Sequence, residues 1–243
     1  MKKATGIILY VMLVAAGGMI VCRPAVAGDA DFETRVDGLI GQLEHGPELV
    51  FYIAFYTDGD RGIVEEAIPM IREQLFNMPF VLVEEEVPLP EDAYVEIRDK
   101  YYAGRMLEIL AENLPKDSVG YLAITDSDIY VGRRPHVRGL ANPELGVAIV
   151  STHRLKYPSR YRYKLRVLKE VLHELGHVLG QEHCEDNSYC IMGFSHGLSE
   201  LDAKYREFCP YHRNELREHL KEKGIDLEKY KIPEKEDKND GDG

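Results

Sequence analysis

The sequence reads His173-Glu174-Leu175-Gly176-His177-Val178-Leu179-Gly180-Gln181-Glu182-His183, and this stretch decides the fold. It follows the pattern H-E-x-x-H-x-x-G-x-x-H. At 3.6 residues per turn, His173 and His177 lie one above the other on the same face of a helix. Gly180 has no Cβ and can adopt the left-handed conformation that ends a helix and turns the chain back. That turn allows His183 to approach the point at which the first two imidazoles meet.

Imidazoles that converge in this way are typical of a catalytic zinc site, which has three protein ligands and one position left for water. The sequence therefore predicts His173, His177 and His183 as zinc ligands. Glu174 follows the first ligand and is predicted to take a proton from the water rather than to bind the metal. Paired histidines also occur on merely polar helix faces. Met192 lies nine residues beyond His183, at the position of a Met-turn. A merely polar helix face would not require this Met, so its presence favours the zinc site.

The residues beyond the zinc motif resemble the archaemetzincin (archaelysin-type) family of metzincin-class zinc metalloproteases. That family continues its zinc motif with His-Cys, then Cys-x-Met, and later Cys-x-x-Cys. The corresponding residues here are His183-Cys184, Cys190-Ile191-Met192 and Cys209-Pro210-Tyr211-His212. The resemblance covers about Glu48 to Leu220, and His212 in place of the fourth Cys is its one departure from the pattern.

The resemblance implies an α/β (α+β) fold of the metzincin-like zincin type, with a mixed twisted sheet, helices, an active-site helix that bears the zinc motif, and a Met-turn. It also implies a second, structural zinc ion beside the catalytic one. Cys184, Cys190, Cys209 and His212 form a Cys₃His set, which is a recognised tetrahedral zinc combination. The alternative for an exported chain is a Cys184–Cys190 disulfide that leaves Cys209 free.

The N-terminus has the layout of a secretory signal peptide. A basic start at Lys2-Lys3 precedes an apolar run from Gly6 to Val21 and an Ala25-Val26-Ala27 cleavage site. Residues 1–27 are therefore predicted to be removed on export to the periplasm or the medium. The alternative is an uncleaved membrane anchor, because the apolar run counted from Ala4 to Cys22 is just long enough to span a bilayer. Removal of Cys22 would leave an odd number of Cys, which fits thiolates on a metal better than a disulfide framework.

The mature chain is predicted to comprise an N-terminal segment (28–48), an archaemetzincin-like peptidase domain (49–220) and a charged C-terminal tail (221–243). The full chain has a formal net charge of −12, which makes it a poor candidate for binding nucleic acid, because binding to phosphates requires clustered Lys and Arg. No nucleic-acid partner is therefore expected. No membrane association is expected once the signal peptide is removed. The sequence does not specify an oligomeric state.

Hydrophobic periodicity predicts strands that alternate with helices, as in an α/β sheet. The predicted strands are 49–56, 80–87, 119–125 and 146–151. The predicted helices are 29–46, 63–76, 92–114, 161–179, 198–208 and 214–223. The run 146–151 fits an ordinary buried strand. It fits equally well the edge strand on which metzincins, the class that the chain resembles, bind their substrate as an added strand.

These features together predict a zinc metallopeptidase, either an endopeptidase or an aminopeptidase, with a peptide or protein as its substrate. Glu174 is expected to act as the general base toward the zinc-activated water and then to pass the proton to the leaving amine. The main alternative is a zinc-stabilised peptide-binding module that does not cleave. Retention of Glu174 argues against that alternative, because such a module gains nothing from an uncompensated carboxylate at the metal. A hydrolase of non-peptide amides would use the same chemistry.

Overall fold

The structure is a computed structural model that describes residues 14–15, 18–19 and 49–231. Two short strands, β1 (Val14–Ala15) and β2 (Gly18–Met19), pair with each other in antiparallel orientation. The rest of the predicted signal peptide, the predicted helix 29–46 and residues 232–243 lie outside the described residues. Within the described residues, no helix combines the length and the apolar character needed to cross a membrane.

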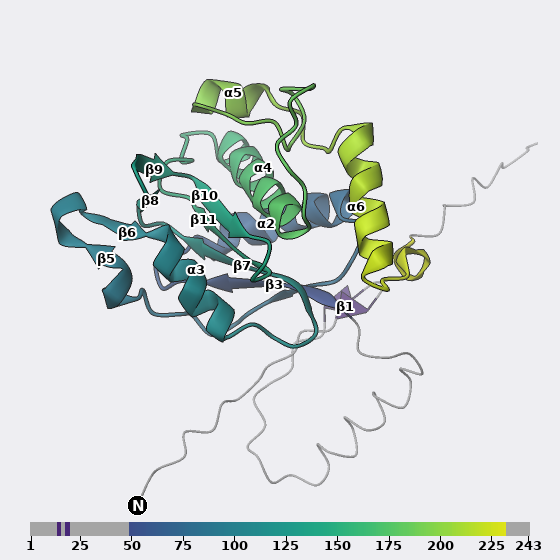
Figure 1. Ribbon diagram of the computed structural model, residues 1–243, viewed down its shortest axis with the longest axis horizontal. Coiled ribbons are helices and arrows are strands. Elements are labelled where there is room, and N and C mark those ends of the chain that lie inside the picture. Colours follow the sequence, from purple (N-terminus) through teal and green to yellow (C-terminus); the bar gives the residue numbers. More distant parts are fainter. Residues whose placement is uncertain (1–13, 16–17, 20–48, 232–243) are drawn as a thin grey trace, which may run out of the picture.

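A five-stranded mixed sheet with the strand order β10-β11-β7-β3-β4 forms the centre of the domain (Figure 1). Four of its strands run parallel to one another, and the fifth, β10, is antiparallel to β11 and forms one edge. The mixed α/β fold predicted from the sequence is therefore confirmed. The strands are β3 (Val50–Phe55), β4 (Phe80–Leu82), β7 (Ser118–Thr125), β10 (Gly139–Asn142) and β11 (Val147–Ser151).

Both faces of this sheet are covered, which explains why its inner strands are apolar throughout. Successive side chains of a strand point to opposite faces. In β3, Phe51 and Ile53 therefore enter one hydrophobic cluster, whereas Ala54 enters the other. In β11, Val150 and Ile149 divide between the two clusters in the same way. The continuous apolar runs in the sequence thus belong to strands that are buried on two sides.

Helices on the two faces complete the layers (Figure 1). The helices α2 (Arg61–Gln74) and α4 (Arg160–Val178) pack on one face, and α3 (Ala103–Glu112) packs on the other. The predicted helix 161–179 corresponds to α4, and its predicted ends are correct to within one residue. Its buried face follows helical spacing, since Leu168 and Leu172 are both fully buried. This packing places the zinc motif at the C-terminal end of a rigid, well-buried helix.

The predicted helix 92–114 is correct only in its second half, which is α3. Its first half consists of two 3-10 turns, Glu91–Ala93 and Glu96–Arg98, and two short strands. Ile97, an apolar residue within the predicted helix, is 95% exposed. The left-handed backbone of Asp99, with φ of 51°, ends any helical path there. Tertiary pairing of aromatic, strand-favouring residues has overridden the local helical pattern.

Those short strands belong to a second, four-stranded sheet with the order β5-β6-β8-β9. Its aromatic residues pack in pairs across neighbouring strands, as the rings of Tyr94 and Tyr101 do at 5.2 Å between centroids. None of its strands was predicted, because each is only two to four residues long. The strands are β5 (Tyr94–Val95), β6 (Lys100–Tyr102), β8 (Ile129–Val131) and β9 (Arg134–Val137).

The predicted strand 146–151 corresponds to β11, which lies between β10 and β7. The interpretation as a buried strand is therefore correct, and the interpretation as an edge strand is wrong. The edge belongs to β10, which was not predicted. Its sequence, Gly139-Leu140-Ala141-Asn142, is too short and too weakly apolar to give a strand pattern.

The C-terminal elements differ from the predicted ranges. The helix α5 (Leu198–Ala203) is shorter than the predicted helix 198–208, and β4 is likewise shorter than the predicted strand 80–87. The helix α6 (Pro210–Glu222) begins before residue 214, with proline in the first turn, where its missing N–H is not needed. Packed structure also continues beyond the predicted domain boundary at 220. Ile225 is 5% exposed and joins the core, and a 3-10 turn, Leu227–Tyr230, follows it.

Candidate metal centre

The histidines of the zinc motif converge as their spacing predicts. Gly180, with φ of 79°, turns the chain after α4 and brings His183 back toward the helix. The Nε2 atom of His177 lies 3.2 Å from Nε2 of His173 and 3.3 Å from Nε2 of His183. Tetrahedral ligands at a Zn–N distance of about 2.0–2.1 Å are themselves roughly 3.3–3.4 Å apart. These two separations therefore match those of ligands on one zinc ion, and the possible ligand atoms of all three histidines lie within 4.8 Å of one another.

Hydrogen bonds at the opposite ring nitrogens determine how two of these imidazoles are protonated. Nδ1 of His173 lies 2.8 Å from the carbonyl oxygen of Ile191, and Nδ1 of His177 lies 2.7 Å from that of Gln181. A carbonyl only accepts, so each Nδ1 carries the proton and each Nε2 presents a lone pair. Burial also lowers the pKa of both histidines, which favours their neutral form. Converging lone pairs repel one another unless a cation lies between them, so these residues fit a metal ion.

Glu174 lies beside this group without belonging to it, since the cluster of possible ligands contains only the three histidines. Its side chain is almost completely buried. Burial raises the pKa of Glu174 well above its usual value, and the neighbouring Glu170 acts in the same direction while Arg138 opposes it. A bound cation would lower that pKa again. The carboxyl group thus lies buried beside the histidines, where its pKa depends on the charges around it.

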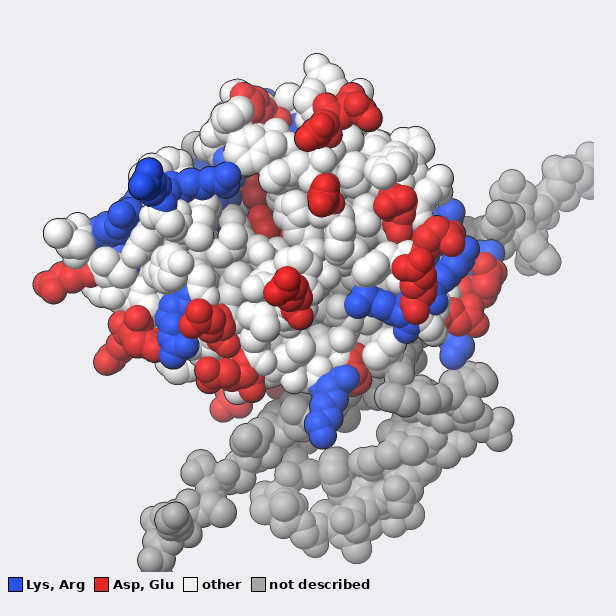
Figure 2. All heavy atoms as spheres, viewed as in Figure 1, with Lys and Arg blue, Asp and Glu red and all other residues white. Residues whose placement is uncertain are grey.

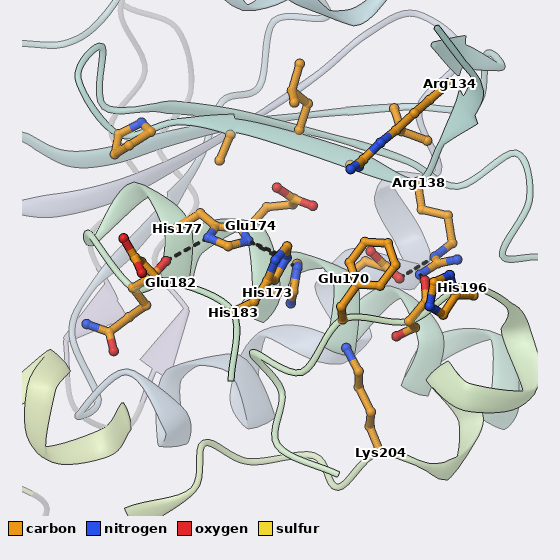
Figure 3. A pocket seen from close by; sticks show the side chains of 18 of the residues that line it. Arg134, Arg138, Glu170, His173, Glu174, His177, Glu182, His183, His196 and Lys204 are labelled. Atoms are coloured by element: carbon orange, nitrogen blue, oxygen red, sulfur yellow. Dashed lines mark hydrogen bonds and ion pairs between the residues drawn. The ribbon is translucent and has the colours of Figure 1, made fainter. Parts of the chain in front are cut away.

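The histidines and Glu174 lie in a cleft of about 910 Å³ (Figure 3). One wall is the chain from Arg134 to Ala141, which includes β9 and β10, and α4 forms the floor. The opposite wall is the segment Phe194–His196, where the ring of Phe194 lies 5.3 Å from that of His183. Figure 2 shows charges of both signs over this face of the molecule, with basic side chains gathered over β9.

The second predicted metal group also comes together. The possible ligand atoms of Cys184, Cys190, Cys209 and His212 all lie within 4.8 Å of one another. Nδ1 of His212 is 3.2 Å from the sulfur of Cys209 and 3.9 Å from that of Cys190. Its Nε2 lies 3.3 Å from the carbonyl oxygen of Glu182, which leaves Nδ1 free to face the sulfurs. All three described cysteines are free thiols, so the alternative disulfide is not formed in this structure.

The sequence pattern of peptidase family M54 matches residues 64–218, which is more than half of the chain. The chain belongs to peptidase family M54, the archaemetzincins. An archaemetzincin of Natronomonas pharaonis is 39% identical over 140 residues, covering 53% of this chain and 78% of that protein. The chain is a zinc metallopeptidase, and the resemblance drawn from the cysteine pattern is confirmed.

Solved structures of other M54 archaemetzincins and related peptidases have the same fold. The crystal structure of archaemetzincin from Methanopyrus kandleri superposes with a TM-score of 0.65 at 30% identity, covering 73% of this chain and 98% of that chain. The crystal structure of a zinc-dependent peptidase from Methanocorpusculum labreanum gives a TM-score of 0.62 at 29% identity, covering 68% of this chain and 99% of that chain. The expected metzincin-like fold is therefore confirmed.

In this M54 peptidase, Met192 supports the floor of the site, as its Met-turn position predicts. It is fully buried, and its sulfur lies 2.4 Å from the point where a Cβ on Gly176 would be. Its carbonyl oxygen accepts a hydrogen bond from the backbone N–H of Cys184 at 2.9 Å. The Met-turn thus packs directly against the zinc-motif helix and is tied to the residue that follows His183.

Gly139 on β10 is a site residue that sequence reasoning did not find. A Cβ built on it would lie 2.4 Å from Oε1 of Glu174. The edge strand can therefore pass over the Glu174 carboxyl group only because residue 139 has no side chain. No local signal identifies this glycine, since its contact joins residues that are far apart in the sequence and belong to different elements.

Gly139→Ala is expected to displace the Glu174 carboxyl group and to lower kcat by up to about 10²-fold, the order of loss produced by a 1 Å misplacement of a reacting group. Zinc content should not change, because Glu174 is not among the possible ligands. Steady-state peptide hydrolysis and metal analysis measure the two effects. Gly197→Ala is the matched control, because a Cβ there has no atom within 4 Å. Equal rates in the two variants would contradict the prediction.

Proposed function

We propose that this zinc metallopeptidase hydrolyses peptide bonds with Glu174 as the general base. The observation that carries the proposal is the convergence of three histidine nitrogens, with Nε2 of His177 at 3.2–3.3 Å from the other two, beside a buried carboxyl group that is not a ligand. This is the division of roles that hydrolysis requires, with one group to hold the metal and another to handle the proton.

His173, His177 and His183 would hold the catalytic ion. When bound, zinc supplies a positive charge that acidifies a water molecule and stabilises negative charge on the substrate carbonyl oxygen. Glu174 takes the proton from the attacking water and then delivers it to the nitrogen of the leaving amine. Its burial at 5% exposure keeps bulk water away from that proton. Arg138, paired with Glu170 at 2.6 Å, lies close enough to moderate the pKa of the Glu174 carboxyl group.

The substrate is proposed to bind along β10 rather than along the predicted strand 146–151. As the edge of the five-stranded sheet, β10 presents backbone groups that no neighbouring strand of that sheet pairs, and it forms part of the cleft wall. A peptide added there in extended conformation would be held through its backbone, which accepts many side-chain sequences. Gly139 would then bring the scissile bond over Glu174, because its backbone passes so close to that side chain that a Cβ there would overlap the carboxyl group.

A structural zinc ion on Cys184, Cys190, Cys209 and His212 is proposed as the second metal. Three thiols and one imidazole nitrogen within 4.8 Å of one another supply a complete tetrahedral set, with no position left for water. This ion would join the chain just after His183 to the start of α6, which includes His212. It would therefore hold the loop that carries the third ligand of the catalytic zinc.

The experiment that tests the proposed function is digestion of a peptide library by the parent protein and by its Glu174→Gln variant. Cleavage by the parent alone supports the mechanism. A parent that binds peptides without cleaving them would instead support the peptide-binding module. A parent that leaves peptides intact but hydrolyses small amides would support the non-peptide hydrolase.

We also propose that the protein is exported after removal of residues 1–27. The basic start, the apolar run and the Ala25-Val26-Ala27 site support this proposal. Protein recovered from its natural host is expected to begin at Gly28. Intact-mass measurement of the soluble and membrane fractions decides the matter. A chain that still begins at Met1 in the membrane fraction would show that the segment is an anchor.

A further inference from the structure

Lys204 is a buried lysine whose ammonium group lies against the Met-turn. It is the C-terminal cap residue of α5 and is 6% exposed. Its Nζ donates hydrogen bonds to the backbone carbonyls of Ile191, at 3.2 Å, and of Gly193. These two carbonyls lie on either side of Met192 in the sequence. The lysine therefore holds the Met-turn at both of its flanks.

The carbonyl oxygen of Ile191 has a second partner, which is a ligand of the proposed catalytic zinc. Nδ1 of His173 donates to that oxygen at 2.8 Å. Two successive hydrogen bonds thus connect the Lys204 ammonium to the His173 ring through one shared acceptor. Figure 3 shows Lys204 extending from below the site toward the group of histidines. The position of the Ile191 carbonyl determines the direction in which Nε2 of His173 points.

No carboxylate within the described residues forms an ion pair with Lys204, and the nearby Glu170 is already paired with Arg138 at 2.6 Å. Burial lowers the pKa of Lys204 to about 8. A buried ammonium without an ionic partner costs stability that an apolar side chain of similar size would not. Its presence here is therefore explained by the two carbonyls that it binds and not by stabilisation of the core.

We propose that Lys204 is a positioning residue of the catalytic metal centre, which clamps the carbonyls on both sides of Met192 and thereby orients His173 toward the metal. This role rests on the proposed three-histidine zinc site. It differs from the role of a ligand, since the hydrogen bonds that the Lys204 ammonium makes within the described residues go to backbone carbonyls and not to the histidines. Lys204 acts on His173 through the Ile191 carbonyl, which accepts the hydrogen bond from Nδ1 of that ligand. Removing a hydrogen-bond partner of a metal ligand commonly weakens metal affinity about 10- to 100-fold.

Lys169 provides a matched control for this proposal. It is also buried, at 4% exposure, and its Nζ donates to the backbone carbonyls of Leu201 and Asp202, both at 2.9 Å. It therefore makes the same kind of contact to the end of α5, but neither of its acceptors binds a histidine of the metal centre. Lys169→Met removes a buried ammonium without touching the Met-turn.

The test compares Lys204→Met with Lys169→Met in the full chain. Cobalt replaces zinc, and the spectrum of His177→Ala, which is expected to keep only the thiolate site, is subtracted so that the remaining visible bands report the three-histidine site. Competition with a chelator then reports the affinity of the three-histidine site alone. Lys204→Met is expected to weaken that affinity about 10- to 100-fold and to shift the visible bands. Lys169→Met should leave both unchanged, and the thiolate absorption should persist in both variants.

An equal loss of cobalt affinity in the two lysine variants would overturn the proposal, because it would indicate a general structural effect. Parent-like affinity in Lys204→Met would overturn it as well. If Lys204→Met does not fold, Lys204→Gln, which keeps an N–H donor but no charge, is expected to show an intermediate loss. His177→Ala distinguishes failure of the proposed three-histidine zinc site from failure of the proposed role of Lys204. If His177→Ala leaves the visible cobalt spectrum unchanged, the proposed zinc site itself is wrong. If His177→Ala abolishes visible bands that Lys204→Met does not affect, only the proposed role of Lys204 is wrong.

Discussion

Glu174→Gln is expected to slow peptide hydrolysis by at least about 10²-fold, the lower range for general acid–base assistance. Gln has nearly the same shape as Glu but cannot accept the proton of the attacking water. Zinc content should stay at the parent value, because the possible metal ligands are the three histidines and not Glu174. Single-turnover hydrolysis of a peptide found by library digestion, together with metal analysis, measures both quantities.

The control for this experiment is His177→Ala, which should lose the catalytic zinc as well as the activity, because it removes one of the converging nitrogens. The two variants therefore separate proton transfer from metal binding. If Glu174→Gln cleaves as fast as the parent, the assigned general base is wrong. If it loses zinc as His177→Ala does, Glu174 is a ligand, and the assignment of the metal site must be revised.

Cys209→Ser is expected to release one of the two proposed zinc ions, and to lower activity although Cys209 is not among the possible ligands of the catalytic metal. The binding free energy of a structural zinc ion is also folding free energy, on the order of 10 kcal/mol in small zinc domains. In this proposal the ion holds the loop after His183 and the start of α6, so without it the third catalytic ligand should lose its fixed position. Metal analysis and thermal unfolding measure the loss.

His212→Ala should reproduce the effect of Cys209→Ser, because it removes the only nitrogen of the group. In the parent protein, the thiols of Cys184, Cys190 and Cys209 should react with a thiol reagent only after a chelator is added. A parent with one zinc ion and a single reactive thiol after chelation would instead indicate the Cys184–Cys190 disulfide. That result would remove the structural zinc and leave the catalytic site unchanged.

The sequence by itself determined the parts of this protein that depend on local spacing. His173 and His177 are one turn apart on a single helix, and Gly180 ends that helix, so their meeting with His183 follows from helix geometry alone. The continuous apolar runs of the inner strands likewise indicated that both faces of the sheet are buried. Cys184 and Cys190 lie close in the sequence, and their partners Cys209 and His212 were found through the family pattern.

Only the tertiary structure decided the parts that depend on distant contacts. Gly139 meets Glu174 across a sheet and a helix, and Lys204 reaches His173 through a carbonyl of a third segment. The predicted helix 92–114 gave way to strands because pairing with β8 stabilises the extended conformation more than local helical periodicity does. The edge of the sheet is β10 and not the predicted strand 146–151 for the same reason. Strand order is set by which segments pair across the fold, and no spacing within one segment records that pairing.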